Sequence, residues 1–127
     1  MTSSKASING DYETERLRGP SRPEIVIYYA PGMVSSPVLR EVLAGLEEEG
    51  VPANALAGRF SEAATLAALA ARESQLEVGL GIGSDGSVGI GHSRCKPDAP
   101  LLVSKGAAWA MGSNAARLVK GIPLRDV

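Results

Sequence analysis

The feature that most constrains the fold is a pair of segments in which apolar residues alternate with small ones. Within residues 76–82 and 88–92, every second residue is apolar or nearly so and most residues between them are glycine. Alternation of this kind is typical of β-strands, whose successive side chains point to opposite faces. Asp85-Gly86 between the two segments favours a tight hairpin turn. The sequence therefore predicts an antiparallel hairpin with one nearly bare face, which is either packed closely by another element or simply thin.

A buried strand and an amphipathic helix are predicted upstream of the hairpin. Residues 24–29 form a continuous β-branched and aromatic run, which is typical of a strand buried on both faces. Ser35 or Ser36 then caps a helix that carries Pro37 in its first turn and ends at Gly50. Its apolar residues lie on one stripe and must face the sheet.

The remaining elements complete an alternation of strands and helices. They are a weak strand at residues 53–58, an alanine-rich helix to Glu73 capped by Ser61, a short buried strand at 101–103 and a two-turn helix at 115–120 capped by Ser113 or Asn114. This order predicts an α/β three-layer sandwich whose mostly parallel sheet carries an antiparallel hairpin.

The 127 residues leave room for one compact domain. Residues 1–23 contain almost no apolar side chains and end in a Pro- and Gly-rich stretch, so we expect a flexible N-terminal tail followed by a single domain over residues 24–127. The alternative for the tail is a short targeting or docking helix around residues 11–18.

Composition excludes several classes of function. The net charge of −1 gives no electrostatic attraction to nucleic acid or to anionic lipid, and no apolar run approaches a membrane span. A single cysteine, Cys95, excludes an internal disulfide and indicates a reducing, cytoplasmic setting. With one histidine and few aromatic residues, the chain is poor in catalytic side chains.

Two patterns near the hairpin suggest chemistry but favour plain structure. Residues 81–86 match G-x-G-x-x-G, yet the segment that follows is strand-like, whereas a dinucleotide site needs a helix there. His92 and Cys95 could pair as base and nucleophile, but no suitable orienting residue beyond Asp98 lies nearby in the sequence. We therefore interpret this region as a hairpin with a histidine at a strand end.

The acidic run Glu47-Glu48-Glu49 conflicts with its position in a helix. It occupies the last turn, where the helix dipole is already negative, and no cation lies one turn before it. The run is either a solvated helix end or a group of carboxylates that meets a cation, from a partner's Arg or Lys or from a shared divalent metal.

The C-terminal segment 114–127 mixes apolar residues, among them Leu118, Val119, Ile122 and Leu124, with three cations, Arg117, Lys120 and Arg125. Apolar residues so close to a chain end indicate either a tail docked on its own domain or a surface for a partner. Both interpretations remain open from the residues alone.

These two regions carry a family resemblance. Residues 40–52, with the triple glutamate, and residues 114–126, which begin NAARLVKGIP, resemble the small subunit of the reactivating factor for adenosylcobalamin-dependent diol and glycerol dehydratases. The match extends in pattern over residues 24–127 and includes His92, although residues 81–91 contain more glycine than is usual in the family.

The resemblance implies a fold similar to the medium subunit of the dehydratase and a non-catalytic role as an interaction protein. It implies a large ATPase partner that holds Mg and ATP, in a complex of two large and two small chains. The small chain occupies the large subunit's docking surface and is exchanged for the dehydratase medium subunit, so that damaged cobalamin is released. The chain itself holds no cofactor, and its location is cytoplasmic or inside a bacterial microcompartment.

The resemblance also implies a site. Glu48 matches the residue that reaches a divalent cation on the large subunit, so the expected partner surface comprises Glu47, Glu48, Glu49, Arg117, Lys120 and Arg125. Two other hypotheses are a stand-alone ligand-binding module or enzyme that uses residues 81–92, and a medium subunit of the dehydratase itself, for which the chain is short.

Overall fold

The computed structural model describes residues 22–96 and 98–127, so the predictions made for residues 1–21 lie outside it. Five strands form one sheet in the order β2-β1-β3-β4-β5. The three strands β1 (Ile25–Tyr29), β2 (Ala53–Ala57) and β3 (Val78–Ile82) pair in parallel, while β4 (Val88–His92) pairs antiparallel with β3 and with β5 (Leu102–Ser104). The hairpin and the mostly parallel sheet predicted from the sequence are confirmed.

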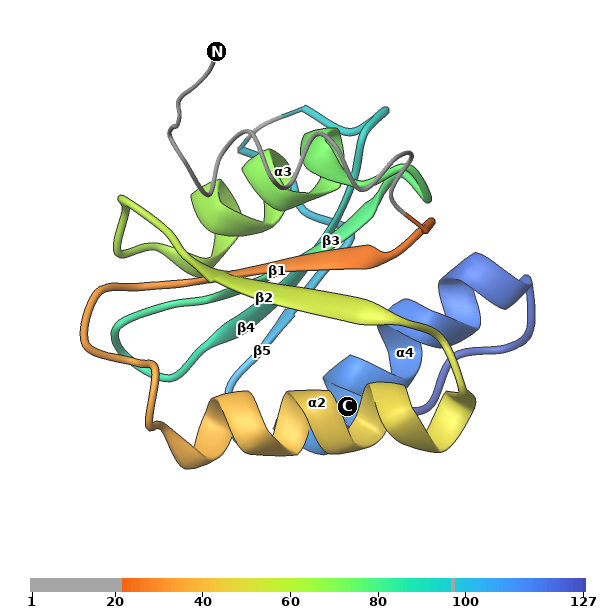
Figure 1. Ribbon diagram of the computed structural model, residues 1–127, viewed down its shortest axis with the longest axis horizontal. Helices are drawn as coiled ribbons and strands as arrows, with labels where there is room; N and C mark the ends of the chain where they lie inside the picture. The colour runs from red at the N-terminus through yellow and green to blue at the C-terminus, as the bar shows by residue number, and fades with distance from the viewer. Residues whose placement is uncertain (1–21, 97) are drawn as a thin grey trace, which may run out of the picture.

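Three layers result because helices cover both faces of the sheet. Helix α3 (Ala63–Glu73) lies on one face, and helices α2 (Pro37–Glu49) and α4 (Ala108–Lys120) lie together on the other (Figure 1). The predicted α/β three-layer sandwich is therefore confirmed. Within the described residues, no helix combines the length and the apolar character needed to span a membrane.

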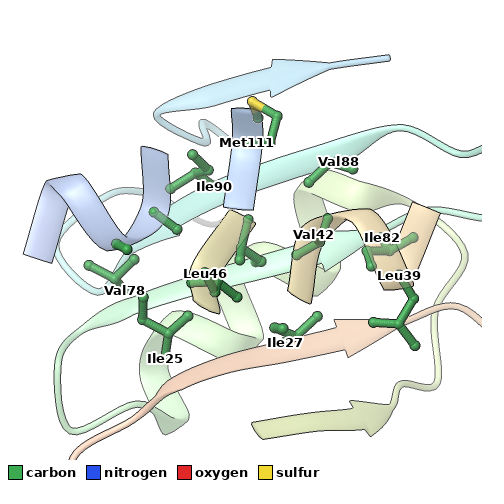
Figure 2. Close-up of a cluster of buried hydrophobic side chains, with 13 residues drawn as sticks. Ile25, Ile27, Leu39, Val42, Leu46, Val78, Ile82, Val88, Ile90 and Met111 are labelled. Carbon is green, nitrogen blue, oxygen red and sulfur yellow. The ribbon is translucent and has the colours of Figure 1, made fainter. Parts of the chain in front are cut away.

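The face towards α2 and α4 carries the large side chains of the core. Isoleucines, valines and leucines from β1, β3 and β4 interlock with residues of both helices (Figure 2). The fully buried members include Ile25, Ile27, Leu46, Leu80 and Met111. Burial of these side chains is the main apolar contribution to folding, at roughly 1.5–3 kcal/mol for each.

The opposite face is the bare one that the glycine alternation predicts. Across the hairpin, Gly79 pairs with Gly91 and Gly81 with Gly89, so four positions without side chains form one patch. The alanines of α3 lie on this patch, and Ala67, Ala70 and Ala71 are fully buried. The prediction that another element packs closely on the bare face is thus confirmed, because α3 lies directly against the glycines.

Helix boundaries differ from the prediction at two places. Ser36 caps α2 as expected, accepting a hydrogen bond from the Val38 amide at 3.0 Å. Ser61, however, does not cap α3: Glu62 occupies the N-cap position without a side-chain hydrogen bond, and the Ser61 carbonyl accepts from the Ser84 amide at 2.9 Å instead. Ser61 therefore contacts the hairpin turn through its carbonyl group and lies one residue before the N-cap.

Helix α4 begins at Ala108, one and a half to two turns before the predicted start. Ser113 and Asn114, expected as caps, lie inside the helix and are fully buried. The sequence prediction failed because these side chains bond to other segments rather than to the helix backbone. Strand β5 is also less buried than predicted, since it lies at the sheet edge and Val103 is 49% exposed.

The close packing of α3 yields a test within one strand. A Cβ added at Gly91 would lie 2.7 Å from the Ala67 carbonyl oxygen, whereas one at Gly89 would lie 3.3 Å from that of Ala63. We expect Gly91→Ala to lower the free energy of unfolding by about 1–3 kcal/mol, because the α3 backbone must move. Gly89→Ala is the matched control and should change it by less than about 1 kcal/mol, since the mildly tight new contact is offset by the lower strand penalty of alanine. Urea unfolding measures both values, and equal losses would contradict this packing account.

Candidate functional site

Glu49, the last residue of α2, lies against α4. Its carboxylate accepts hydrogen bonds from the Ser113 hydroxyl at 2.7 Å, from Nε of Arg117 at 2.9 Å and from Nζ of Lys120 at 3.0 Å. Lys120 also donates to the Glu49 carbonyl oxygen at 2.9 Å, which satisfies one of the free carbonyls at the end of α2. The Glu49 side chain is 8% exposed, so most of its surface is covered by these partners.

These donors hold the pKa of the Glu49 carboxyl at about 2, below its ordinary value of 4.5. The hydrogen bond from Ser113 is the largest cause, and those from Lys120 and Arg117 follow. Desolvation acts in the opposite direction and is outweighed. The Glu49 carboxylate is therefore negatively charged at neutral pH.

The chain after α4 folds back onto the same helix. Buried Asn114 donates from Nδ2 to the Arg125 carbonyl oxygen at 3.0 Å and accepts from the Arg125 amide at 2.6 Å. Arg117 donates to the Pro123 carbonyl oxygen at 3.0 Å. The tail is in neither a strand nor a helix, and these side-chain bonds hold its backbone. They confirm that the C-terminal segment is docked on its own domain.

The Arg125 side chain completes the arrangement. Its Nε donates to the Ser113 hydroxyl oxygen at 2.8 Å, and its Nη2 lies 3.5 Å from the Glu49 carboxylate. The guanidinium carbon lies 4.8 Å from the ring centre of Trp109, within the range of a cation–π contact. We call Glu49, Ser113, Arg117, Lys120 and Arg125 the Glu49 cluster; it joins α2, α4 and the tail.

The cluster brings together residues from two segments that lie far apart in the sequence. Of the expected partner residues, Arg117, Lys120 and Arg125 each pair with Glu49 inside the chain. Glu47 and Glu48 lie outside the cluster and are exposed. The helix-end conflict is thus relieved by cations from a distant segment, while contact of any of these residues with a partner stays a prediction.

Sequence reasoning missed Ser113 and Trp109 as members of this region. Both lie on the part of α4 that was expected to precede the helix or to cap it. A signal was nonetheless present, since Arg117 and Lys120 are three residues apart and share one helix face, where a buried carboxylate can bind both.

The described residues of this chain do not form a complete metal site by themselves. Among residues 22–96 and 98–127, no group of three or more His, Cys, Asp or Glu side chains is placed to hold an ion. Divalent Mg and Ca require several oxygen ligands. A cation at Glu48 would therefore take its other ligands from another molecule.

The hairpin region does not have the geometry of a nucleotide or nucleophile site. The Gly83 amide donates to the Ser87 carbonyl oxygen at 2.8 Å and the Asp85 carboxylate accepts from the Ser87 amide at 2.9 Å, so the G-x-G-x-x-G segment is a closed turn. Nδ1 of His92 accepts from the Arg94 amide at 3.1 Å. That nitrogen is consequently engaged with the backbone rather than with Cys95.

The pKa of Glu49 predicts how stability depends on pH. In the unfolded chain the carboxyl returns to its ordinary value near 4.5, so the stabilisation is fully present above that pH and is lost as the pH falls towards 2. We expect Glu49→Gln to be less stable at neutral pH and to show a flatter stability profile between these two values. Thermal unfolding across this pH range tests both expectations.

A second variant checks the cause of the low pKa. Ser113→Ala removes the strongest donor and should raise the pKa of Glu49, as followed by NMR titration of the carboxyl carbon. An unchanged pKa in Ser113→Ala, or a Glu49→Gln profile parallel to that of the parent chain, would refute the account given for the cluster.

Comparisons with known proteins identify the family of this chain. Residues 22–125 match the family described as dehydratase medium subunit. The chain is 33% identical over 113 residues to the probable glycerol dehydratase-reactivating factor small subunit of Citrobacter freundii, which covers 84% of this chain and 97% of the relative. It is 43% identical over 94 residues to the diol dehydratase-reactivating factor small subunit of Klebsiella michiganensis, covering 69% of this chain and 74% of the relative.

Solved structures give the same result for the fold. A chain of a glycerol dehydratase reactivase superposes with a TM-score of 0.76 and 34% identity, covering 83% of this chain and 98% of that one. A chain from the diol dehydratase-reactivating factor complexed with ADP and Mg2+ gives a TM-score of 0.73 and 37% identity, covering 84% and 100%. On sequence and structure together, the chain belongs to the dehydratase medium subunit family and is similar to the small subunits of dehydratase-reactivating factors.

Proposed function

We propose that this chain is the non-catalytic small subunit of a dehydratase-reactivating factor. It occupies a docking surface on a large ATPase subunit, in a complex of two large and two small chains, and is exchanged there for the medium subunit of an adenosylcobalamin-dependent diol or glycerol dehydratase. The exchange opens the inactivated dehydratase so that damaged cobalamin leaves.

The observation that carries the proposal is the extent of the similarity. The reactivase chain of known structure aligns over 98% of its own length, so the match covers a whole subunit rather than a shared motif. One relative is named as a complex with ADP and Mg2+, and this chain has neither a phosphate-binding loop nor a metal cluster in its described residues. We infer that the large subunit binds the nucleotide and the metal.

The end of α2 is suited to contact such a partner. Glu48 is exposed and lies beside the Glu49 cluster, whose contacts hold this helix end in place. The cluster itself combines one carboxylate with three cations, so Glu48 stands at a rigid surface of mixed charge. We infer that Glu48 supplies one ligand to a divalent cation held by the large subunit.

The docked tail adds apolar surface next to this charge. Ile122, Leu124 and Val127 are 40%, 47% and 51% exposed although the backbone around them is fixed by the Asn114 and Arg117 bonds. Exposed apolar side chains on an ordered segment are typical of an interface. The tail is thus docked on its own domain and also available to a partner.

Reactivation is the direct test of the function. The assay contains dehydratase blocked with cyanocobalamin, the large subunit, ATP, magnesium and free adenosylcobalamin, with and without this chain. We expect recovery of dehydratase activity to require the chain, because the chain restores the large subunit between rounds of exchange. Equal recovery in both arms would reject the proposal.

The metal role of Glu48 has its own test. We expect Glu48→Ala to weaken assembly with the large subunit by about tenfold at limiting magnesium, the loss of roughly 1.4 kcal/mol, since one ligand to the shared cation is removed. Titration calorimetry with and without chelator measures the difference. Glu41→Ala, an exposed carboxylate near the opposite end of the same helix, is the matched control. Affinity that is equal for parent and Glu48→Ala in both conditions would exclude the metal role.

A further inference from the structure

Strand β2 leaves one edge of the sheet open. The Ile25 amide donates to the Pro52 carbonyl oxygen at 3.0 Å and the Gly58 amide donates to the Tyr29 carbonyl oxygen at 2.8 Å, so even-numbered residues of this segment face β1. Alternate residues of a strand direct their backbone groups to opposite sides. The backbone groups of Ala53, Ala55 and Ala57 therefore point away from the sheet, where the described chain supplies no further strand.

This edge lacks the features that usually keep sheet edges apart. Soluble proteins protect an open edge with lysine, proline or a bulge, whereas β2 has the sequence ANALA and regular pairing. Its side chains are small, apart from Leu56, which is 43% exposed. No side chain of β2 itself is charged, and Arg22 lines the grooves beside the strand.

A stripe on α2 flanks the same edge. Arg40, Leu43 and Glu47 are all exposed, while the residues that contact α4 lie elsewhere on the helix. Leu43 and Glu47 line a shallow groove together with Ala53, the first residue of β2. Figure 1 shows α2 running alongside β2 below the sheet.

Both elements are self-complementary about their centres. When β2 meets a second β2 in antiparallel pairing centred on Ala55, Ala53 lies opposite Ala57 and Asn54 opposite Leu56. The same two-fold axis brings the two α2 helices together antiparallel. Arg40 of each copy then faces Glu47 of the other, with the two Leu43 side chains between them.

We propose that the open edge of β2 and the Arg40–Leu43–Glu47 stripe of α2 bind a second copy of this chain, joining two five-stranded sheets into one. The surface is isologous, as a two-fold dimer requires. Glu48 is the next residue along α2 and lies about 100° further round the helix, so it is not a member of the stripe. The dimer does not depend on the reactivase role, and either proposal can fail without the other.

Charge reversal tests this geometry in the full-length chain. We expect the parent chain to dimerise reversibly in sedimentation velocity runs from micromolar to submillimolar concentration. Arg40→Glu or Glu47→Arg alone places like charges opposite each other at two points and should weaken dimerisation by about tenfold or more. The double variant Arg40→Glu/Glu47→Arg restores both pairs and should dimerise like the parent.

Mixing the two single variants is the most discriminating test of the proposed pairing. One chain then carries two acidic residues in the stripe and the other two basic ones, so the mixed dimer regains both pairs and should form in preference to either homodimer. Arg72→Glu changes an exposed residue of α3, so it is the charge-matched control and should leave dimerisation unchanged. Circular dichroism verifies that each variant is folded.

Three results would overturn the proposal. They are a parent chain that stays monomeric over the whole range, single variants that dimerise like the parent, and a mixture that does not favour the mixed dimer. Ala55→Pro offers an independent check, because it removes an outward amide without breaking a bond to β1; in a folded Ala55→Pro variant, undiminished dimerisation would exclude pairing through the β2 edge.

Discussion

The close approach of α2 and α4 is the contact on which the Glu49 cluster and the docked tail depend. Gly45 of α2 lies against the backbone of α4 at Trp109 and Ser113, and Gly112 of α4 lies against Val42. Without side chains at these two positions the helices pack backbone to backbone. Ser113, Arg117 and Lys120 are consequently within hydrogen-bonding distance of Glu49, and the tail after α4 is held through Asn114. Helix packing thus creates the ionic cluster, and the cluster in turn fixes the chain end.

The two faces of the sheet are packed in different ways. Large apolar side chains under α2 and α4 form the core, whereas glycine and alanine under α3 allow a thin, close layer. The polar groups near the hairpin are engaged in turns. What the chain presents to other molecules is surface: the α2 end with Glu48, the tail, and the open β2 edge. This distribution suits a subunit that acts by binding other proteins.

Much of the fold could be predicted because local patterns and tertiary packing agree. The glycine alternation with Asp85-Gly86 predicted the hairpin, and Ser36, Pro37 and Gly50 marked both ends of α2. Predictions failed where a polar side chain served a distant segment. Ser113 and Asn114 are residue types that cap helices, but their side chains bond to Glu49 and Arg125, whereas Ser61 contacts the hairpin through its backbone carbonyl. Cap chemistry and long-range hydrogen bonding use the same residue types, so the sequence does not distinguish them.

The sequence by itself determined the fold class, the hairpin and two segments of unusual composition, namely the acidic end of α2 and the apolar and basic C-terminal segment. These are properties of periodicity, composition and resemblance, which need no knowledge of contacts. Only the tertiary structure decided that the two regions meet, that Glu49 is neutralised inside the chain while Glu48 stays exposed, and that β2 is an open edge. The reason is physical: Glu49 and Arg125 are 76 residues apart in the chain, and the energy of an ion pair depends on distance in space, which folding alone establishes.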